Sequence, residues 1–111
     1  MAKRGRHNAT GRQETVVEDR KKKGKPVVLE EKLGEWILET RTFDPNTPPV
    51  ELHLSMGLTK NLGEFQFARM DIGVSIPCMP EEMEHYFKRA KKWITTKLQR
   101  EVQRINEDFV E

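Results

Sequence analysis

Apolar and polar residues alternate most regularly in the middle of the chain. From Val50 to Leu58 every second residue is apolar, and the residues between them are polar or small. A period of two is typical of a β-strand that buries one face in a core. The pattern predicts a strand from Val50 to about Leu58, with His53 and Ser55 on its outer face.

The next segment, from Asn61 to Pro77, predicts a strand whose two faces differ in chemistry. Its core face is apolar and consists of Ala68, Met70, Ile72, Val74 and Ile76. Its other face carries Phe65, Phe67, Arg69, Asp71 and Ser75. Aromatic rings beside a guanidinium suit base stacking and phosphate pairing with a single-stranded nucleic acid, and the same rings suit burial against a partner subunit.

Turn-forming residues between these two segments predict that they form an antiparallel pair. Asn61 can bond locally, and Gly63 can adopt a positive φ. If the two core faces coincide, His53 lies on the same outer face as Phe65, Phe67 and Arg69. A slip of one residue would place them on opposite faces.

Earlier in the chain, Glu35 to Phe43 has the β-branched and aromatic content of a strand. The turn formers of Asp44 to Pro49 predict a long-loop hairpin between this strand and the one that starts at Val50. Pro26 to Leu29 can add a short edge strand or only fasten the preceding segment to the body of the protein.

Towards the end of the chain, apolar residues recur every three or four positions from Met83 to Phe109. This spacing predicts a helix over about 80–110, and Pro80 with the glutamates after it suits a helix start. A helix of roughly 30 residues is about 45 Å long, more than the predicted sheet would cover. The distal apolar residues therefore predict a homo-oligomer interface, formed by Leu98, Val102, Ile105 and Phe109. The alternative is a break near Arg100, after which the chain folds back.

Together these elements predict an α+β fold: an antiparallel meander of three or four strands followed by one long C-terminal helix. With 111 residues, the chain has room for one modest core. The single domain is expected at 26–111.

Charge divides the chain at about residue 25. Residues 1–25 carry nine Lys and Arg against three acidic residues, which gives about +6, although the whole chain is only +2. Because this segment is poor in large apolar residues, 1–25 is expected to be a disordered basic arm. Lys21, Lys22, Lys23 and Lys25 would attract phosphates, or would be a solvated terminus or a localisation signal. On the helix, Lys88 and Lys92 extend this basic character or form an ordinary solvated face.

Motifs that would indicate an enzyme are missing from the sequence. It has no glycine-rich phosphate loop, no paired-cysteine motif and no histidine pair at metal-ligand spacing, so we expect no catalysis, no cofactor, no metal and no small-molecule substrate. The one acid/base cluster worth considering is His53 with Glu51 or Asp71. We expect a cytoplasmic protein, in the host cell if the protein is viral, because the chain has a single cysteine, Cys78. We expect no membrane partner, because the sequence has no apolar run of membrane-spanning length.

One segment of the chain consists of the run Asn61-Leu62-Gly63-Glu64-Phe65, followed by Arg69, by Gly73 to Cys78 and by a charged helix. This segment resembles small proteins encoded by bacteriophages and other mobile elements. The resemblance covers about Val50 to Leu98. It implies a phage-type accessory protein that handles DNA, with Phe65 at the aromatic position and Arg69 at the basic one. Phe67 departs from the small polar residue expected there.

The function predicted from these features is non-catalytic binding of single-stranded nucleic acid, with DNA favoured. Phe65 and Phe67 would stack bases, Arg69 and His53 would assist, and the basic arm with the helix lysines would hold phosphates. The alternative is a protein-interaction or assembly module, in which the same phenylalanines and the long helix make subunit contacts.

Overall fold

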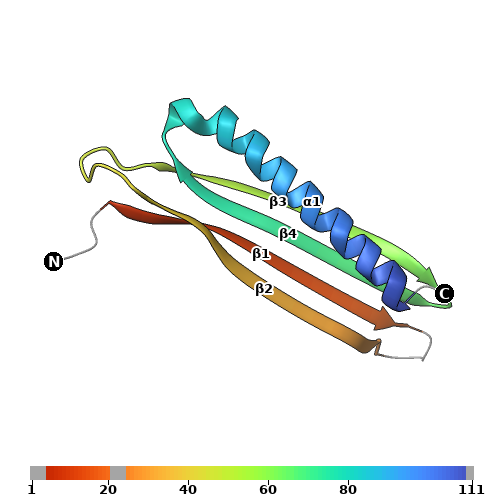
Figure 1. Cartoon of the computed structure of the whole chain (residues 1–111). Helices are drawn as coiled ribbons and strands as arrows, with labels where there is room; N and C mark the ends of the chain where they lie inside the picture. Colours follow the sequence, from red (N-terminus) through yellow and green to blue (C-terminus); the bar gives the residue numbers. More distant parts are fainter. Residues whose placement is uncertain (1–4, 21–24, 110–111) are drawn as a thin grey trace.

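The structure is a computed structural model that describes residues 5–20 and 25–109. It contains one four-stranded sheet, a short 3₁₀ turn and one long helix (Figure 1). The elements are β1 (Arg6–Asp19), β2 (Val27–Thr42), β3 (Val50–Gly63), β4 (Gln66–Cys78), η1 (Pro80–Glu82) and α1 (Met83–Phe109). The strand order is β2-β1-β4-β3, and every neighbouring pair is antiparallel. The α+β fold class, with a long helix after the strands, is confirmed.

Strand β1 lies in the middle of the sheet, between β2 and β4. The prediction of a disordered arm is therefore wrong for Arg6–Asp19. The side chains that β1 buries are mostly small or polar, so the segment shows no apolar alternation, while Arg6, Arg12, Glu14 and Glu18 lie on the opposite face. The buried set is Ala9, Gly11, Gln13, Thr15 and Val17. The remainder of the predicted arm at 1–4 and 21–24 lies outside the described residues.

Strand β2 begins at Val27 and continues through Gly34, so Val27 to Leu29 forms the start of a long edge strand. Its partner is β1, whereas β3 lies on the opposite edge of the sheet. The predicted hairpin between the strand at Glu35 and the strand at Val50 is therefore wrong. β1 pairs along most of its length with both β2 and β4, and the turn-rich loop after β2 carries the chain across to the far edge instead.

The pairing of β3 with β4 agrees with the sequence prediction. Opposite residues include His53 with Ser75, Thr59 with Arg69 and Asn61 with Phe67, so the core faces of the two strands coincide. The predicted helix is also present, and it continues without a break past Arg100 to Phe109. Among the described residues, no helix is both long and apolar enough to span a membrane.

Helix α1 packs on one face of the sheet, which we call the helix face, and the opposite face is called the outer face (Figure 1). Two apolar clusters fill the contact. One contains Ile72, Val74, Ile76 and Ile94, and the other is centred on Val17, Ala68, Met70 and Ile105.

The distal helix residues predicted to form an oligomer interface pack within the chain. Ile105 is fully buried, and Leu98, Val102 and Phe109 pack against the second cluster. The strands have 13 to 16 residues and extend for about 43 to 53 Å, whereas the 27 residues of α1 extend for about 40 Å. The sheet is long enough to cover the whole helix, so helix length gives no reason to expect an oligomer. The interface prediction is wrong for Ile105, which is fully buried, and stays a prediction for Leu98, Val102 and Phe109, which are partly buried.

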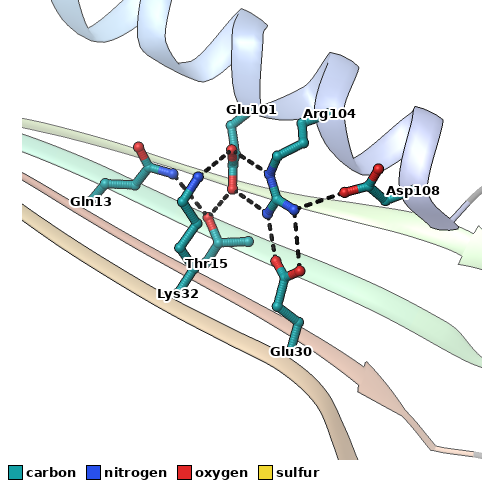
Figure 2. A network of polar contacts seen from close by, with 7 residues as sticks. All are labelled: Gln13, Thr15, Glu30, Lys32, Glu101, Arg104 and Asp108. Carbon is teal, nitrogen blue, oxygen red and sulfur yellow. Dashed lines mark hydrogen bonds and ion pairs between the residues drawn. The ribbon is translucent and has the colours of Figure 1, made fainter.

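A polar network fastens the distal half of α1 to β1 and β2 (Figure 2). At its centre is Glu101, which is 4% exposed, accepts a hydrogen bond from Thr15 Oγ1 at 2.7 Å and pairs with Arg104 at 2.8 Å. Arg104 also bonds both carboxylate oxygens of Glu30 on β2, and Lys32 Nζ lies 3.7 Å from Glu101. Thr15 is therefore satisfied by a helix that is distant in sequence, and Gln13 donates to Thr15 Oγ1 at 3.4 Å.

Candidate nucleic-acid interface

The predicted nucleic-acid residues are divided between the two faces of the molecule. His53, Phe67 and Arg69 lie on the outer face, in the register that the sequence predicted. Lys88 and Lys92 lie on α1, on the other side of the sheet. Lys25 is exposed just before β2, and Lys21, Lys22 and Lys23 lie outside the described residues. The structure therefore does not gather them into one site.

Phe65 is not part of a strand. It occupies the tight turn between β3 and β4, where both Glu64 (φ 49°) and Phe65 (φ 67°) have left-handed backbone conformations. Its side chain is 63% exposed at the tip of the hairpin. The sequence pattern missed this because Gly63 pairs directly with Gln66, which leaves a two-residue loop.

The remaining outer-face residues already have partners within the chain. The Arg20 guanidinium lies 5.1 Å above the centre of the Phe67 ring. Arg69 Nε is 4.0 Å from Asp71, and His53 Nδ1 is 2.8 Å from Ser75 Oγ. About 27 Å of strand separates Phe67 from the position of Ser75, so His53 and Phe67 do not act on the same nucleotide.

Charge also argues against phosphate binding on the outer face. Opposite residues of an antiparallel pair point to the same side of a sheet, so the strand registers identify which charged residues share this face. We consider the outer-face residues of β1 from Thr10 to Glu18 and the residues opposite them on the neighbouring strands. The charged residues among them are five carboxylates (Glu14, Glu18, Glu31, Glu35 and Asp71) and two guanidiniums (Arg12 and Arg69). This region of the outer face is therefore net acidic.

The strongest positive surface is on α1. Six cations and no acidic residue lie between His85 and Arg100: Lys88, Arg89, Lys91, Lys92, Lys97 and Arg100. Within the part of the chain that the structure describes, Lys88 is the one member of this set with a carboxylate in ion-pair range, Glu84 at 3.4 Å. The next acid along the helix, Glu101, points into the core and is occupied by Thr15 and Arg104. Among these cations, Glu84 therefore offsets the charge of Lys88 alone within the described residues.

Beside this surface, a groove of about 650 Å³ separates α1 from the first half of β1 and the second half of β2. Its lining combines an apolar floor, two aromatic residues, a rim of three cations and one carboxylate, Glu39 of β2. The floor includes Ala9, Val74 and Ile76, the aromatic residues are Tyr86 and Trp93, and the cations are Arg89, Lys92 and Arg100. Lys92 and Thr96 also line a shallow hollow on the helix surface together with Lys88 and Lys91. The groove and the helix surface are therefore continuous.

Aromatic rings hold two cations of this region in place of carboxylates. Lys97 Nζ lies 4.2 Å from the ring centre of Trp36 and 5.5 Å from that of Trp93. The Arg89 guanidinium lies 5.6 Å from the ring of Tyr86. A ring orients a cation without cancelling its charge, so these groups retain their field for an anionic ligand.

Sequence reasoning selected Lys88 and Lys92 but missed Lys91, Lys97 and the groove. The absence of acidic residues from His85 to Arg100, in a chain with 34% charged residues, was a usable sign of the helix surface. The groove was not predictable, because it depends on β1 and β2 lying beside the helix. Comparisons with known proteins give no further lead: no family model matches the chain, and no curated protein or solved structure matches it significantly.

Proposed function

We propose that this protein binds single-stranded nucleic acid, with DNA favoured, through the basic surface of α1 and the groove beside it. The observation that carries the proposal is the run of cations from Lys88 to Arg100 without an acidic residue on the helix between them. Within the described residues, five of these six cations have no carboxylate in ion-pair range, and such cations attract a polyphosphate backbone, because neutralising phosphates releases condensed counterions.

In this mechanism, Lys88, Lys91 and Lys92 hold phosphates along the helix, and Arg100 holds one at the rim of the groove. Bases turn towards the apolar floor beside Trp93. A duplex keeps its bases stacked inside, so the groove lining favours a single strand. The contacts are to the backbone and to base faces, and little sequence preference is expected.

Other observations are compatible with this role. The resemblance of the segment around Asn61 to Phe65 to phage-encoded proteins favours DNA. A reducing cytoplasm, in the host cell if the protein is viral, would keep the free thiol of Cys78 reduced.

The test is fluorescence anisotropy with a labelled oligothymidylate and a duplex of equal length, at several salt concentrations. Lys91→Gln with Lys92→Gln is the test variant, and Arg12→Gln with Arg69→Gln removes the same charge from the outer face. We expect the test variant to lower the slope of log affinity against log salt by about 1.4, at about 0.7 for each lost phosphate contact. The control should match the unaltered protein. Equal losses in both variants, or no binding by the unaltered protein, would reject the proposed interface.

Tryptophan fluorescence tests the contribution of the bases separately. The chain has two tryptophans, and the ring centres of Trp36 and Trp93 are 6.0 Å apart beside the groove. Oligothymidylate should quench their emission, whereas inorganic polyphosphate should bind with little quenching. Identical spectra with the two polyanions would restrict the interaction to phosphates.

A further inference from the structure

The exposed edge of β2 has no strand partner within the described residues. β2 is the longest strand, with 16 residues, and β1 is its one neighbour in the sheet. An open edge offers backbone N–H and C=O groups to an extended segment of another chain. Many proteins protect such an edge from pairing with other chains by keeping the strand short or by placing charged residues on it. β2 is long, so its charged residues are the protection to consider.

Three of the four charged residues on the helix face of β2, all except Glu39, are paired with α1 or η1. Glu30 bonds Arg104, Lys32 pairs with Glu101, and Arg41 pairs with Glu82 at 3.1 Å. These residues hold the strand against its own domain. Their charges are largely balanced before any partner arrives.

Charges on the outer face of β2 are different, because they are acidic and have no ion-pair partner among the described residues. Glu31 and Glu35 alternate here with Leu33 and Ile37, since each lies opposite an outer-face residue of β1. Leu33 is 69% exposed and Ile37 is 67% exposed, and no large apolar residue in the described chain is more exposed than these two. The outer face of this edge strand therefore presents acidic and apolar side chains alternately, at every second residue from Glu31 to Ile37.

We propose that the β2 edge binds an extended segment of a partner protein in which basic and apolar residues alternate on one face. Backbone hydrogen bonds would add the segment as a fifth strand. Its apolar side chains would cover Leu33 and Ile37, and its lysines or arginines would lie beside Glu31 and Glu35. Charge complementarity selects this occupant over a second β2, because self-pairing would bring the unpaired glutamates of both copies together. The proposal is independent of nucleic-acid binding, which uses α1 and the groove.

The probe is a fluorescein-labelled nonapeptide with the repeating sequence Thr-Val-Thr-Lys-Thr-Val-Thr-Lys-Thr, measured by anisotropy with the full chain. A second peptide replaces both lysines with glutamate, and a third carries proline at alternate threonines and so cannot complete the backbone ladder. We expect the lysine peptide to bind and the other two to bind at least about ten-fold more weakly.

Variants on exposed positions locate the contact without disturbing the core. Glu31→Lys with Glu35→Lys should reverse the preference in favour of the glutamate peptide, and Leu33→Lys should weaken binding of the lysine peptide. Thr59→Lys on β3, at the opposite edge, is the control and should leave the affinity for the lysine peptide unchanged.

Three results would overturn the proposal. The first is no measurable binding of the lysine peptide by the unaltered protein, and the second is a charge-reversed variant with unchanged peptide preference. The third is a dimer of the unaltered protein in sedimentation experiments that dissociates to a monomer in the Leu33→Lys variant. This result would make a second copy of the chain the occupant of the edge.

Discussion

The buried carboxylate of Glu101 gives the clearest quantitative prediction for the stability of this fold. Burial alone would raise the pKa of this carboxyl, but hydrogen bonds from Arg104 and Thr15, with the charges of Arg104 and Lys32, outweigh burial and lower the pKa from 4.5 to about 2. This lowering of the pKa corresponds to about 3 kcal/mol of stabilisation, at about 1.36 kcal/mol for each tenfold change in proton affinity. The Glu101 side chain is almost completely shielded from solvent, so screening removes little of this contribution.

The substitution that tests this contribution is Glu101→Gln. Glutamine keeps the shape of the side chain and one acceptor oxygen but loses the charge that faces Arg104 and Lys32. We expect the free energy of unfolding at pH 7 to fall by about 2 to 3 kcal/mol. Arg104 keeps Glu30 and Asp108 as partners, so its own charge remains compensated.

The pH dependence provides a sharper test than the single value at pH 7. The folded pKa of Glu101 lies below its unfolded value, so its stabilisation is fully present above about pH 5 and is lost as pH falls towards 2. The unfolding free energies of the unaltered protein and of Glu101→Gln should therefore differ most above pH 5 and converge below it.

Urea unfolding followed by circular dichroism, repeated at several pH values, measures both curves. Glu84→Gln is the control, because Glu84 forms an exposed pair with Lys88 and its loss should change stability little. A constant difference between the two proteins from pH 7 to pH 2 would refute the assignment of this stabilisation to the ionised Glu101.

Three further predictions concern the core glycine, the β3–β4 turn and the buried thiol. Gly11→Ala should cost about 1 to 3 kcal/mol of unfolding free energy, because a Cβ there would lie 2.6 Å from Trp93 Cη2; an unchanged urea midpoint would contradict the contact. Glu64→Asn with Phe65→Gly should stabilise the protein by about 1 kcal/mol, since these residues suit positive φ, and a lower melting temperature would show that the turn residues contribute otherwise. Burial raises the pKa of the Cys78 thiol, so Ellman's reagent at pH 8 should label the folded protein at least about ten-fold more slowly than the urea-unfolded chain, and equal rates would place the thiol at the surface.

The sequence patterns predicted those elements whose buried faces are apolar. β3, β4 and α1 bury regular apolar sets, so a period of two or of three to four residues was sufficient. β1 was missed because Gln13 and Thr15 occupy core positions, and their burial is tolerable only with a polar partner such as Glu101, 86 residues from Thr15 in the chain. No local pattern contains that partner.

Sequence reasoning also placed functional residues less well than it placed strands. The predicted placement of His53 and Phe67 on the outer face was correct. The partners of the outer-face residues were not predicted: Arg20 lies over the Phe67 ring, and Arg69 is close to Asp71 on the same strand. The strand pattern does not reveal these contacts. The helix surface was partly visible, because the cations there are neighbours in the sequence. The groove combines residues from β1, β2, β4 and α1, so its composition depends on the strand order.

The central position of β1 affects how the chain folds as it is synthesised. The β1–β2 hairpin leaves the ribosome well before β4, yet β1 obtains its second neighbour only when Gln66–Cys78 has emerged. Until then the hairpin has two open edges, and pairing over so large a sequence separation is slow. The last strand and the helix that follows it therefore complete a sheet of which one central strand, β1, was made first, and a chain that starts at Pro26 would lack that central strand rather than a tail.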